Sequence, residues 1–176
     1  PVLFPDITYS FYKVWADLYR ISYETPALDE NMAIRPLDYK GENGGIIFPN
    51  PNAPTGVYMP LDQVEEIVKA NQDVIVIVDE AYIDFAGPSA RELLSGYDNL
   101  LVVQTFSKSR SMAGVRIGFA LGSPVLIKAL NDVKYSYNSY TMNLPSQLAG
   151  TQAVKDRAYF EETRAKIMDT RERAKK

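Results

Sequence analysis

The sequence contains no cysteine and no histidine. The absence of cysteine excludes disulfide bonds and thiol nucleophiles, and the absence of both residues excludes the usual zinc sites. Without an imidazole, proton transfer has to rely on lysine, tyrosine, aspartate or glutamate side chains. Candidate acid–base groups are therefore sought among these four residue types.

Long apolar runs and a strong net charge are also missing. The apolar stretches are too short to span a bilayer, and no basic and hydrophobic leader is present. The formal net charge is only -3, with acidic and basic residues interspersed, so no broad cationic face is available for a phosphate backbone. We expect a cytoplasmic protein that binds neither a membrane nor a nucleic acid.

The composition is that of an ordinary soluble domain. With 46% hydrophobic and 23% charged residues, 176 residues are enough for one sizeable core. The chain opens at Pro1 without an initiator methionine and breaks off within a charged helical stretch, Arg171 to Lys176. We therefore expect one domain that is truncated at both ends.

Helical and extended patterns alternate along the chain. Apolar residues recur at helical spacing over 10–20, 61–70 and 124–135, and from about 146 or 151 to the end with a break near Asp156. A short extended piece is expected over 21–24, buried strands over 46–48 and 74–78, and further strands over 100–105 and 116–121. This alternation predicts an α/β fold, a mainly parallel sheet with helices on both faces.

Three of the expected strand ends carry polar groups. In sheets of this class, ligands bind beyond the carboxyl ends of the strands. The segments that follow such ends are Pro49–Gly56, Asp79–Tyr82 and Thr105–Lys108. They supply an amide, a carboxylate, a phenol, hydroxyls and an amine, and we expect them to form one site.

The motifs at these strand ends are NPNAPTG (50–56), DEAYIDF (79–85) and TFSKSRSMAGVRIGF (105–119). Their order and spacing resemble the pyridoxal-phosphate-dependent aminotransferases of class I and II, most closely the histidinol-phosphate aminotransferase branch. The resemblance implies that residues 1–176 form the large, cofactor-binding domain of the fold type I transferases. It also implies that the helix from about residue 151 leads toward a small domain.

The resemblance makes Lys108 the catalytic residue. In the family, this lysine binds the aldehyde of pyridoxal 5'-phosphate covalently and then moves a proton between substrate and cofactor. Such a lysine must be partly neutral, which partial burial beside other cations favours. Considered alone, Lys108 is an ordinary solvated lysine in the polar run Ser107 to Ser111.

Asp79 and Tyr82 match two further cofactor contacts of the family. The family aspartate pairs with the pyridine nitrogen and keeps it protonated, so that the ring can accept electrons. The family tyrosine donates a hydrogen bond to the phenolic oxygen of the cofactor. From the residues alone, Asp79 is equally a helix cap or loop carboxylate, and Tyr82 an ordinary half-buried tyrosine.

Arg116 lies where the family has the arginine that holds the cofactor phosphate. A guanidinium group suits a dianion, and the hydroxyls of Thr105 and Ser107 would complete the cradle. The alternatives are a surface salt bridge for the arginine and structural capping for the two hydroxyls.

Tyr9 and Asn52 complete the expected site. Tyr9 resembles the aromatic residue that stacks on the pyridine ring, although packing in the core is an alternative. The family loop is NPNNPTG, and the asparagine immediately before PTG contacts the phenolic oxygen of the cofactor. In this sequence that position is Ala53. Asn52 is assigned to this contact instead. Tyr137 and Asn138 match a Tyr-Asn pair of the same branch, or simply form a loop.

The resemblance implies a transfer of an amino group from histidinol phosphate to 2-oxoglutarate, in the biosynthesis of histidine, by a homodimer without a metal. Four alternatives stay open at this point. The first two are a threonine-phosphate decarboxylase and another amino-acid aminotransferase of the same fold. The others are a non-catalytic domain that senses pyridoxal phosphate, and a folded core that is too incomplete to bind the cofactor.

Overall fold

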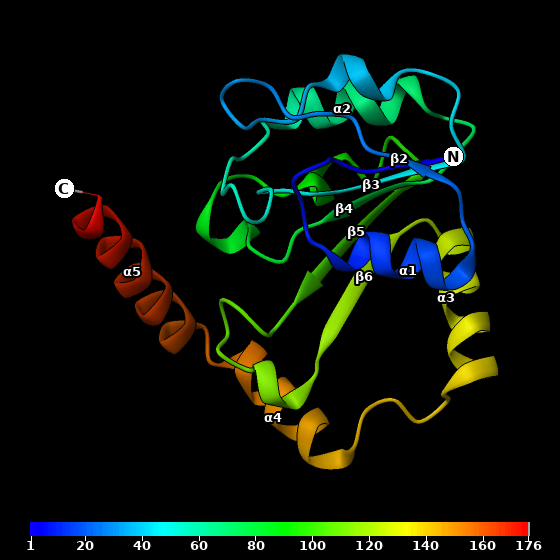
Figure 1. Cartoon of the computed structure of the whole chain (residues 1–176). Coiled ribbons are helices and arrows are strands. Elements are labelled where there is room, and N and C mark those ends of the chain that lie inside the picture. The colour runs from blue at the N-terminus through cyan, green and yellow to red at the C-terminus, as the bar shows by residue number, and fades with distance from the viewer. Residues whose placement is uncertain (176) are drawn as a thin grey trace.

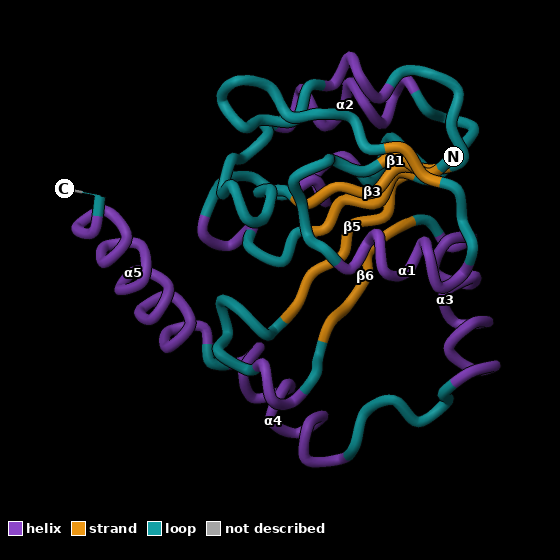
Figure 2. Tube along the Cα trace, viewed as in Figure 1, coloured by secondary structure: helices purple, strands orange, loops and turns teal. Residues whose placement is uncertain are grey.

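A six-stranded sheet forms the centre of the protein, in the spatial order β2-β1-β3-β4-β5-β6. The computed structural model describes residues 1–175. The strands are β1 (Val2–Leu3), β2 (Tyr23–Glu24), β3 (Gly45–Pro49), β4 (Val76–Asp79), β5 (Leu100–Thr105) and β6 (Gly118–Gly122). Neighbouring strands from β2 to β5 pair in parallel and β6 is antiparallel to β5. Figure 2 shows the strands side by side, in orange. The predicted mainly parallel sheet is confirmed.

Helices cover both faces of the sheet, as predicted. They are α1 (Phe11–Tyr19), α2 (Leu61–Ala70), α3 (Pro124–Tyr137), α4 (Leu144–Lys155) and α5 (Arg157–Ala174). Figure 1 shows α2 on one side of the sheet, α1 on the other, and α5 extending away toward the C-terminus. The break expected near Asp156 is confirmed, because this residue ends α4 and caps α5 with its side chain. No helix within residues 1–175 combines the length and apolarity needed to cross a membrane.

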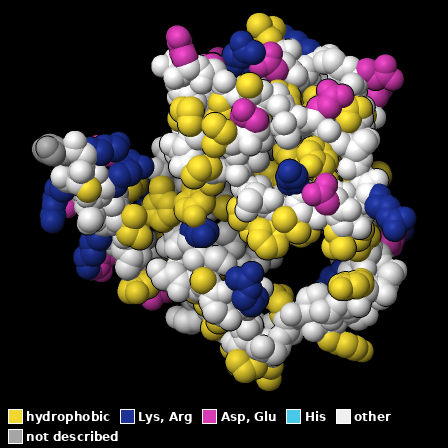
Figure 3. All heavy atoms as spheres, viewed as in Figure 1, with side chains coloured by type: hydrophobic (Ala, Val, Ile, Leu, Met, Phe, Trp, Pro, Cys, Tyr) yellow, Lys and Arg dark blue, Asp and Glu magenta, His cyan; other side chains and the backbone are white. Residues whose placement is uncertain are grey.

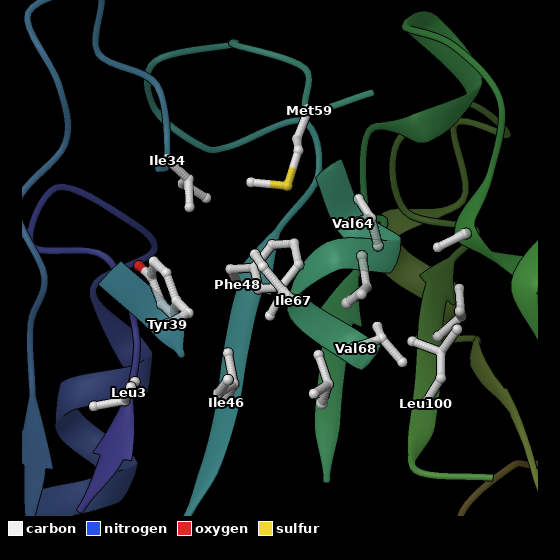
Figure 4. Packing of buried hydrophobic residues seen from close by; sticks show 14 residues of the cluster. Leu3, Ile34, Tyr39, Ile46, Phe48, Met59, Val64, Ile67, Val68 and Leu100 are labelled. Carbon is white, nitrogen blue, oxygen red and sulfur yellow. The ribbon is translucent and has the colours of Figure 1, made fainter. Parts of the chain in front are cut away.

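The larger core lies between the sheet and α2 (Figure 4). Its members from the strands and from α2 are Ile46, Phe48, Val76, Val78, Leu100, Val102, Val64, Ile67 and Val68. Successive side chains of a strand point to opposite faces. The even-numbered residues of β3, β4 and β5 therefore face α2, and the odd-numbered residues face α1.

A smaller core lies on the α1 face. Phe4, Tyr12 and Ala16 are buried there, and the partly buried Ile47 packs against them. Because Ile47 pairs with Ile77 and Pro49 pairs with Asp79, the strand alternation also turns the Asp79 side chain toward α1. This orientation brings the last residue of β4 to the helix that covers this face.

The bounds of β2, β3 and β4 differ from the predicted 21–24, 46–48 and 74–78. The strand expected from Val74 begins at Val76, because Val74 lies in a turn in which its N–H donates to the Asn71 carbonyl. Ile77 is only half-buried, since the α1 side has the smaller core. The two-residue strand β1 was not predicted.

Arg116 was expected within a strand, and this expectation is wrong. A 3-10 turn over Ala113–Val115 is followed by Arg116 in the left-handed backbone conformation, with φ 57°. This turn reverses the chain, so that β6 starts at Gly118 and pairs with Thr105 at the end of β5. Arg116 therefore lies in the turn beyond the end of β5.

A buried carboxylate fastens the end of β4 to its neighbours. Glu80 is 1% exposed and accepts hydrogen bonds from the Ser89 hydroxyl (2.6 Å), the Ala90 N–H (2.6 Å) and the Gln104 amide (2.7 Å). Burial raises the pKa of Glu80, and these hydrogen bonds offset part of the rise. Glu80 thereby joins β4 to β5 and to the turn around Ala90.

Replacement of Glu80 by glutamine is expected to change how stability depends on pH. The raised pKa means that the folded protein binds this proton more tightly than the unfolded chain does. Below the ordinary pKa of 4.5, protonated Glu80 makes its full contribution to the free energy of unfolding. This contribution is lost as the pH rises through the raised pKa of Glu80 in the folded protein. The free energy of unfolding of Glu80→Gln, relative to the unmodified protein, should therefore increase from pH 4.5 to neutrality.

Urea unfolding across this pH range measures the difference. Glu42→Gln, at an exposed position, is the matched control. A difference between Glu80→Gln and the unmodified protein that stays constant or falls with rising pH contradicts the prediction.

Candidate functional site

The sheet register places three polar segments at one edge. Pro49 of β3 pairs with Asp79 of β4, and Asp79 pairs with Val103 of β5. Because the three strands are parallel, the segments that follow them leave the same edge of the sheet. The loop after Pro49, the turn after Asp79 and the segment through Lys108 therefore start side by side.

Asp79 is held by two hydrogen bonds. Its Oδ2 accepts from the Tyr12 hydroxyl at 2.8 Å, and its Oδ1 accepts from the Ala81 N–H at 3.1 Å. Tyr12 was not predicted as a site residue. Its only signal in the sequence is its position three residues after Tyr9, in the same aromatic segment.

Tyr9 lies at the same end of α1. The residue is 46% exposed, and its ring meets the ring of Tyr12 edge-on, with 5.6 Å between the centroids. The ring also stacks on Phe11 at 5.8 Å. Tyr9 is therefore at the surface beside the partner of Asp79, and its ring is not part of the buried core.

Lys108 and Tyr82 lie together beyond the ends of β5 and β4. The Lys108 Nζ is 5.0 Å from the centroid of the Tyr82 ring, a cation–π contact. The partial burial expected of Lys108 is not observed, because the side chain is exposed. Within residues 1–175 no carboxylate forms a salt bridge with its ammonium group. The amine therefore has space for a ligand.

The hydroxyls of Thr105 and Ser107 are brought together. Their oxygens are 3.0 Å apart, and the Ser107 N–H donates to Thr105 Oγ1 at 3.1 Å. The Thr105 hydroxyl also lies 3.2 Å from the carbonyl of Ile117, the residue after Arg116. The backbone of Arg116 is thus next to this pair, but its guanidinium donates to the Ala113 carbonyl at 2.9 Å.

The side chain of Asn52 is buried and forms hydrogen bonds with other residues of the chain. It is 2% exposed, and its Nδ2 donates to the Ile7 carbonyl (3.0 Å) and to Thr55 Oγ1 (3.2 Å). Its Oδ1 accepts from the Thr8 hydroxyl at 3.0 Å. Asn52 therefore ties the loop after β3 to the segment before α1.

A cleft of about 550 Å³ is lined by two of the candidate residues, Asn52 and Tyr82. Ala53 of the loop after β3 and Ile167 and Arg171 of α5 also line it. The Arg171 guanidinium donates to the Phe85 carbonyl at 2.9 Å. A small molecule bound near Tyr82 has room in this cleft.

The pair Tyr137 and Asn138 forms a helix end. Tyr137 is the last residue of α3 and is 90% exposed. The N–H of Asn138 donates to the Lys134 carbonyl at 2.8 Å. The position of Tyr137 and Asn138 is explained by a structural role at the end of α3, without a role in the site.

The donor set at the sheet edge fits an aromatic cofactor that carries a phosphate. Asp79 offers a fixed carboxylate, Lys108 an amine, and Thr105 with Ser107 a pair of hydroxyls. Paired hydroxyls suit a phosphate group, and a carboxylate suits a protonated ring nitrogen. Residues 1–175 contain no group of three acidic side chains placed to hold a metal ion.

The chain is similar in sequence to known aminotransferases. The sequence pattern of the aminotransferase class I and II family matches residues 1–176. The histidinol-phosphate aminotransferase of Pseudomonas putida is 58% identical over 172 residues, which are 98% of this chain and 49% of that protein. The chain thus spans about half the length of the curated relatives it matches.

Solved structures share the fold. The histidinol-phosphate aminotransferase of Clostridium acetobutylicum superposes with a TM-score of 0.89 and 26% identity, over 98% of this chain and 53% of that chain. The histidinol-phosphate aminotransferase of Sinorhizobium meliloti, solved in complex with pyridoxal-5'-phosphate, has a TM-score of 0.88 at 23% identity, over 99% and 49% of the two chains. The match over every residue and the shared fold show that this chain belongs to the aminotransferase class I and II family.

Proposed function

We propose that the protein is a pyridoxal-phosphate-dependent aminotransferase that transfers an amino group from histidinol phosphate to 2-oxoglutarate. The observation that carries this proposal is the position of Asp79 at the carboxyl end of β4 and of Lys108 just beyond the carboxyl end of the neighbouring parallel strand β5. Histidinol phosphate as a substrate is supported by the name of the Pseudomonas putida relative, which is 58% identical.

Each residue has a defined task in this proposal. Pyridoxal phosphate, when bound, supplies an aldehyde that takes up the amino group and a ring that accepts electrons. Asp79 holds the proton on the ring nitrogen. The Lys108 amine anchors the cofactor and moves a proton to and from the substrate, and Tyr82 donates to the phenolic oxygen beside it.

The remaining site residues hold the phosphate and shape the pocket. Thr105, Ser107 and Arg116 are assigned to the phosphate. Within residues 1–175 the Arg116 guanidinium makes one hydrogen bond, to a carbonyl, which leaves most of its five donors for this ligand. The exposed ring of Tyr9 stacks on the cofactor. Asn52 supports the site through the loop that it ties to Ile7.

The architecture proposed for the whole protein is a cytoplasmic homodimer. Residues 1–176 are the large domain, and α5 leads toward a small domain. An exposed apolar face of α1 supports contacts with a further domain or a second subunit. The exposed apolar residues of α1 are Phe11, Val14, Trp15, Leu18 and Tyr19. Figure 3 shows hydrophobic side chains spread over the front of the molecule, where Figure 1 places α1.

Lys108→Ala tests the attachment of the cofactor. The unmodified full-length protein is expected to turn yellow with pyridoxal phosphate and, after reduction with borohydride, to carry the added mass on the peptide that contains Lys108. The variant should show neither, because no other amine is assigned to the aldehyde. Lys128→Ala, a surface lysine paired with Asp132, is the matched control and should behave as the unmodified protein does. Labelling of a different lysine would reject the assignment.

Turnover separates transamination from decarboxylation. Full-length protein with histidinol phosphate and 2-oxoglutarate is expected to form glutamate, and Lys108→Ala should lower the rate by about 100-fold or more, because the proton carrier is lost. Glutamate formation and carbon dioxide release are measured in parallel, the latter with threonine phosphate. Carbon dioxide without glutamate would favour the decarboxylase.

A further inference from the structure

A tyrosine from α1 reaches the acid at the end of β4. The Tyr12 hydroxyl lies 2.8 Å from Asp79 Oδ2, although the two residues are 67 positions apart in the sequence. Tyr12 is 4% exposed and lies in the first turn of α1. At this distance the buried hydroxyl forms a hydrogen bond that connects α1 to the end of β4.

The carboxylate of Asp79 has acceptor positions that its protein contacts do not fill. Oδ1 accepts the Ala81 N–H at 3.1 Å, and the Asp79 carbonyl accepts the Asn50 N–H at 2.8 Å. A carboxylate has about four acceptor positions on its two oxygens, and residues 1–175 supply donors to two of them. The carboxylate is thus fixed at both oxygens and can still accept from a ligand.

Tyr12 is the donor in this pair. Burial, followed by the negative charge of Asp79, raises the pKa of Tyr12 far above its ordinary value, so the phenol keeps its proton. Its ring is held by aromatic neighbours, with centroids 5.6 Å from Tyr9, 6.0 Å from Phe4 and 6.4 Å from Trp15. The hydroxyl therefore has little freedom to move away from Asp79.

We propose that Tyr12 is a positioning residue for Asp79: its hydroxyl fixes the carboxylate in the orientation that accepts a protonated ring nitrogen. This inference rests on the proposed function, since it concerns the same site. Without the phenol, the side chain of Asp79 can rotate about its Cα–Cβ and Cβ–Cγ bonds. Binding of the cofactor then has to order a side chain that Tyr12 otherwise holds in place.

The test compares Tyr12→Phe with Tyr39→Phe in the full-length protein. Both substitutions remove one hydroxyl from a buried tyrosine, but Tyr39 lies in the core on the α2 face. Tyr12→Phe is expected to raise the dissociation constant for pyridoxal phosphate by about 10-fold, the factor for one hydrogen bond to a charged group. Tyr39→Phe should leave it unchanged. The melting temperatures of the cofactor-free variants report any general loss of stability.

A double-mutant cycle connects the effect to Asp79. In the Asp79→Asn background, the effect of Tyr12→Phe on the dissociation constant should shrink to about 2-fold or less, because the carboxylate it positions is gone. An undiminished effect in that background, or cofactor binding by Tyr12→Phe that equals or exceeds that of the unmodified protein, overturns the proposal. Failure of the unmodified protein to bind pyridoxal phosphate instead rejects the proposed function.

A second measurement covers a Tyr12→Phe variant that does not fold. A fluorinated tyrosine placed only at position 12 keeps the hydroxyl and gives a fluorine NMR signal. This signal is expected to move when pyridoxal phosphate is added, and to move less in the Asp79→Asn protein. A signal that stays in place while the cofactor binds overturns the role of Tyr12.

Discussion

The alternation of side chains across the end of β4 is the constraint on which the site depends. Asp79 and Glu80 are adjacent acids, and the pleat of the strand turns them to opposite faces of the sheet. Asp79 meets Tyr12 of α1, whereas Glu80 meets Ser89 and Gln104 on the face that α2 covers. A shift of one residue in the register would exchange the two carboxylates. The same strand end therefore directs Asp79 toward the proposed ligand and Glu80 into hydrogen bonds that connect β4 to its neighbours.

Hydrogen bonds between distant segments keep the edge of the sheet in shape. Glu80 joins β4 to Gln104, the residue before Thr105, so the ends of β4 and β5 are tied together. On the opposite face, Tyr12 binds Asp79 and Asn52 binds Ile7, so α1 and the segment before it are tied to two strand ends. The groups proposed to bind the cofactor thus start from a fixed frame, which lowers the ordering that binding requires.

Local patterns were enough for much of the fold. The helix over 61–70 and the strand over 100–105 have the ends that the sequence predicted, because hydrophobic periodicity is a property of neighbouring residues. The parallel sheet followed from the alternation of strands and helices. The position of Arg116 could not be predicted in this way, because its left-handed backbone depends on how β6 turns back to pair with β5.

The sequence by itself determined the fold class and the family, and it named Asp79, Tyr82 and Lys108 as residues at strand ends. Only the tertiary structure decided which groups these side chains meet. It assigned the phenol of Tyr12 to Asp79 and the ring of Tyr82 to Lys108. The physical reason is that a sequence pattern records which face of an element is buried, whereas a contact between residues 67 positions apart depends on how the elements pack.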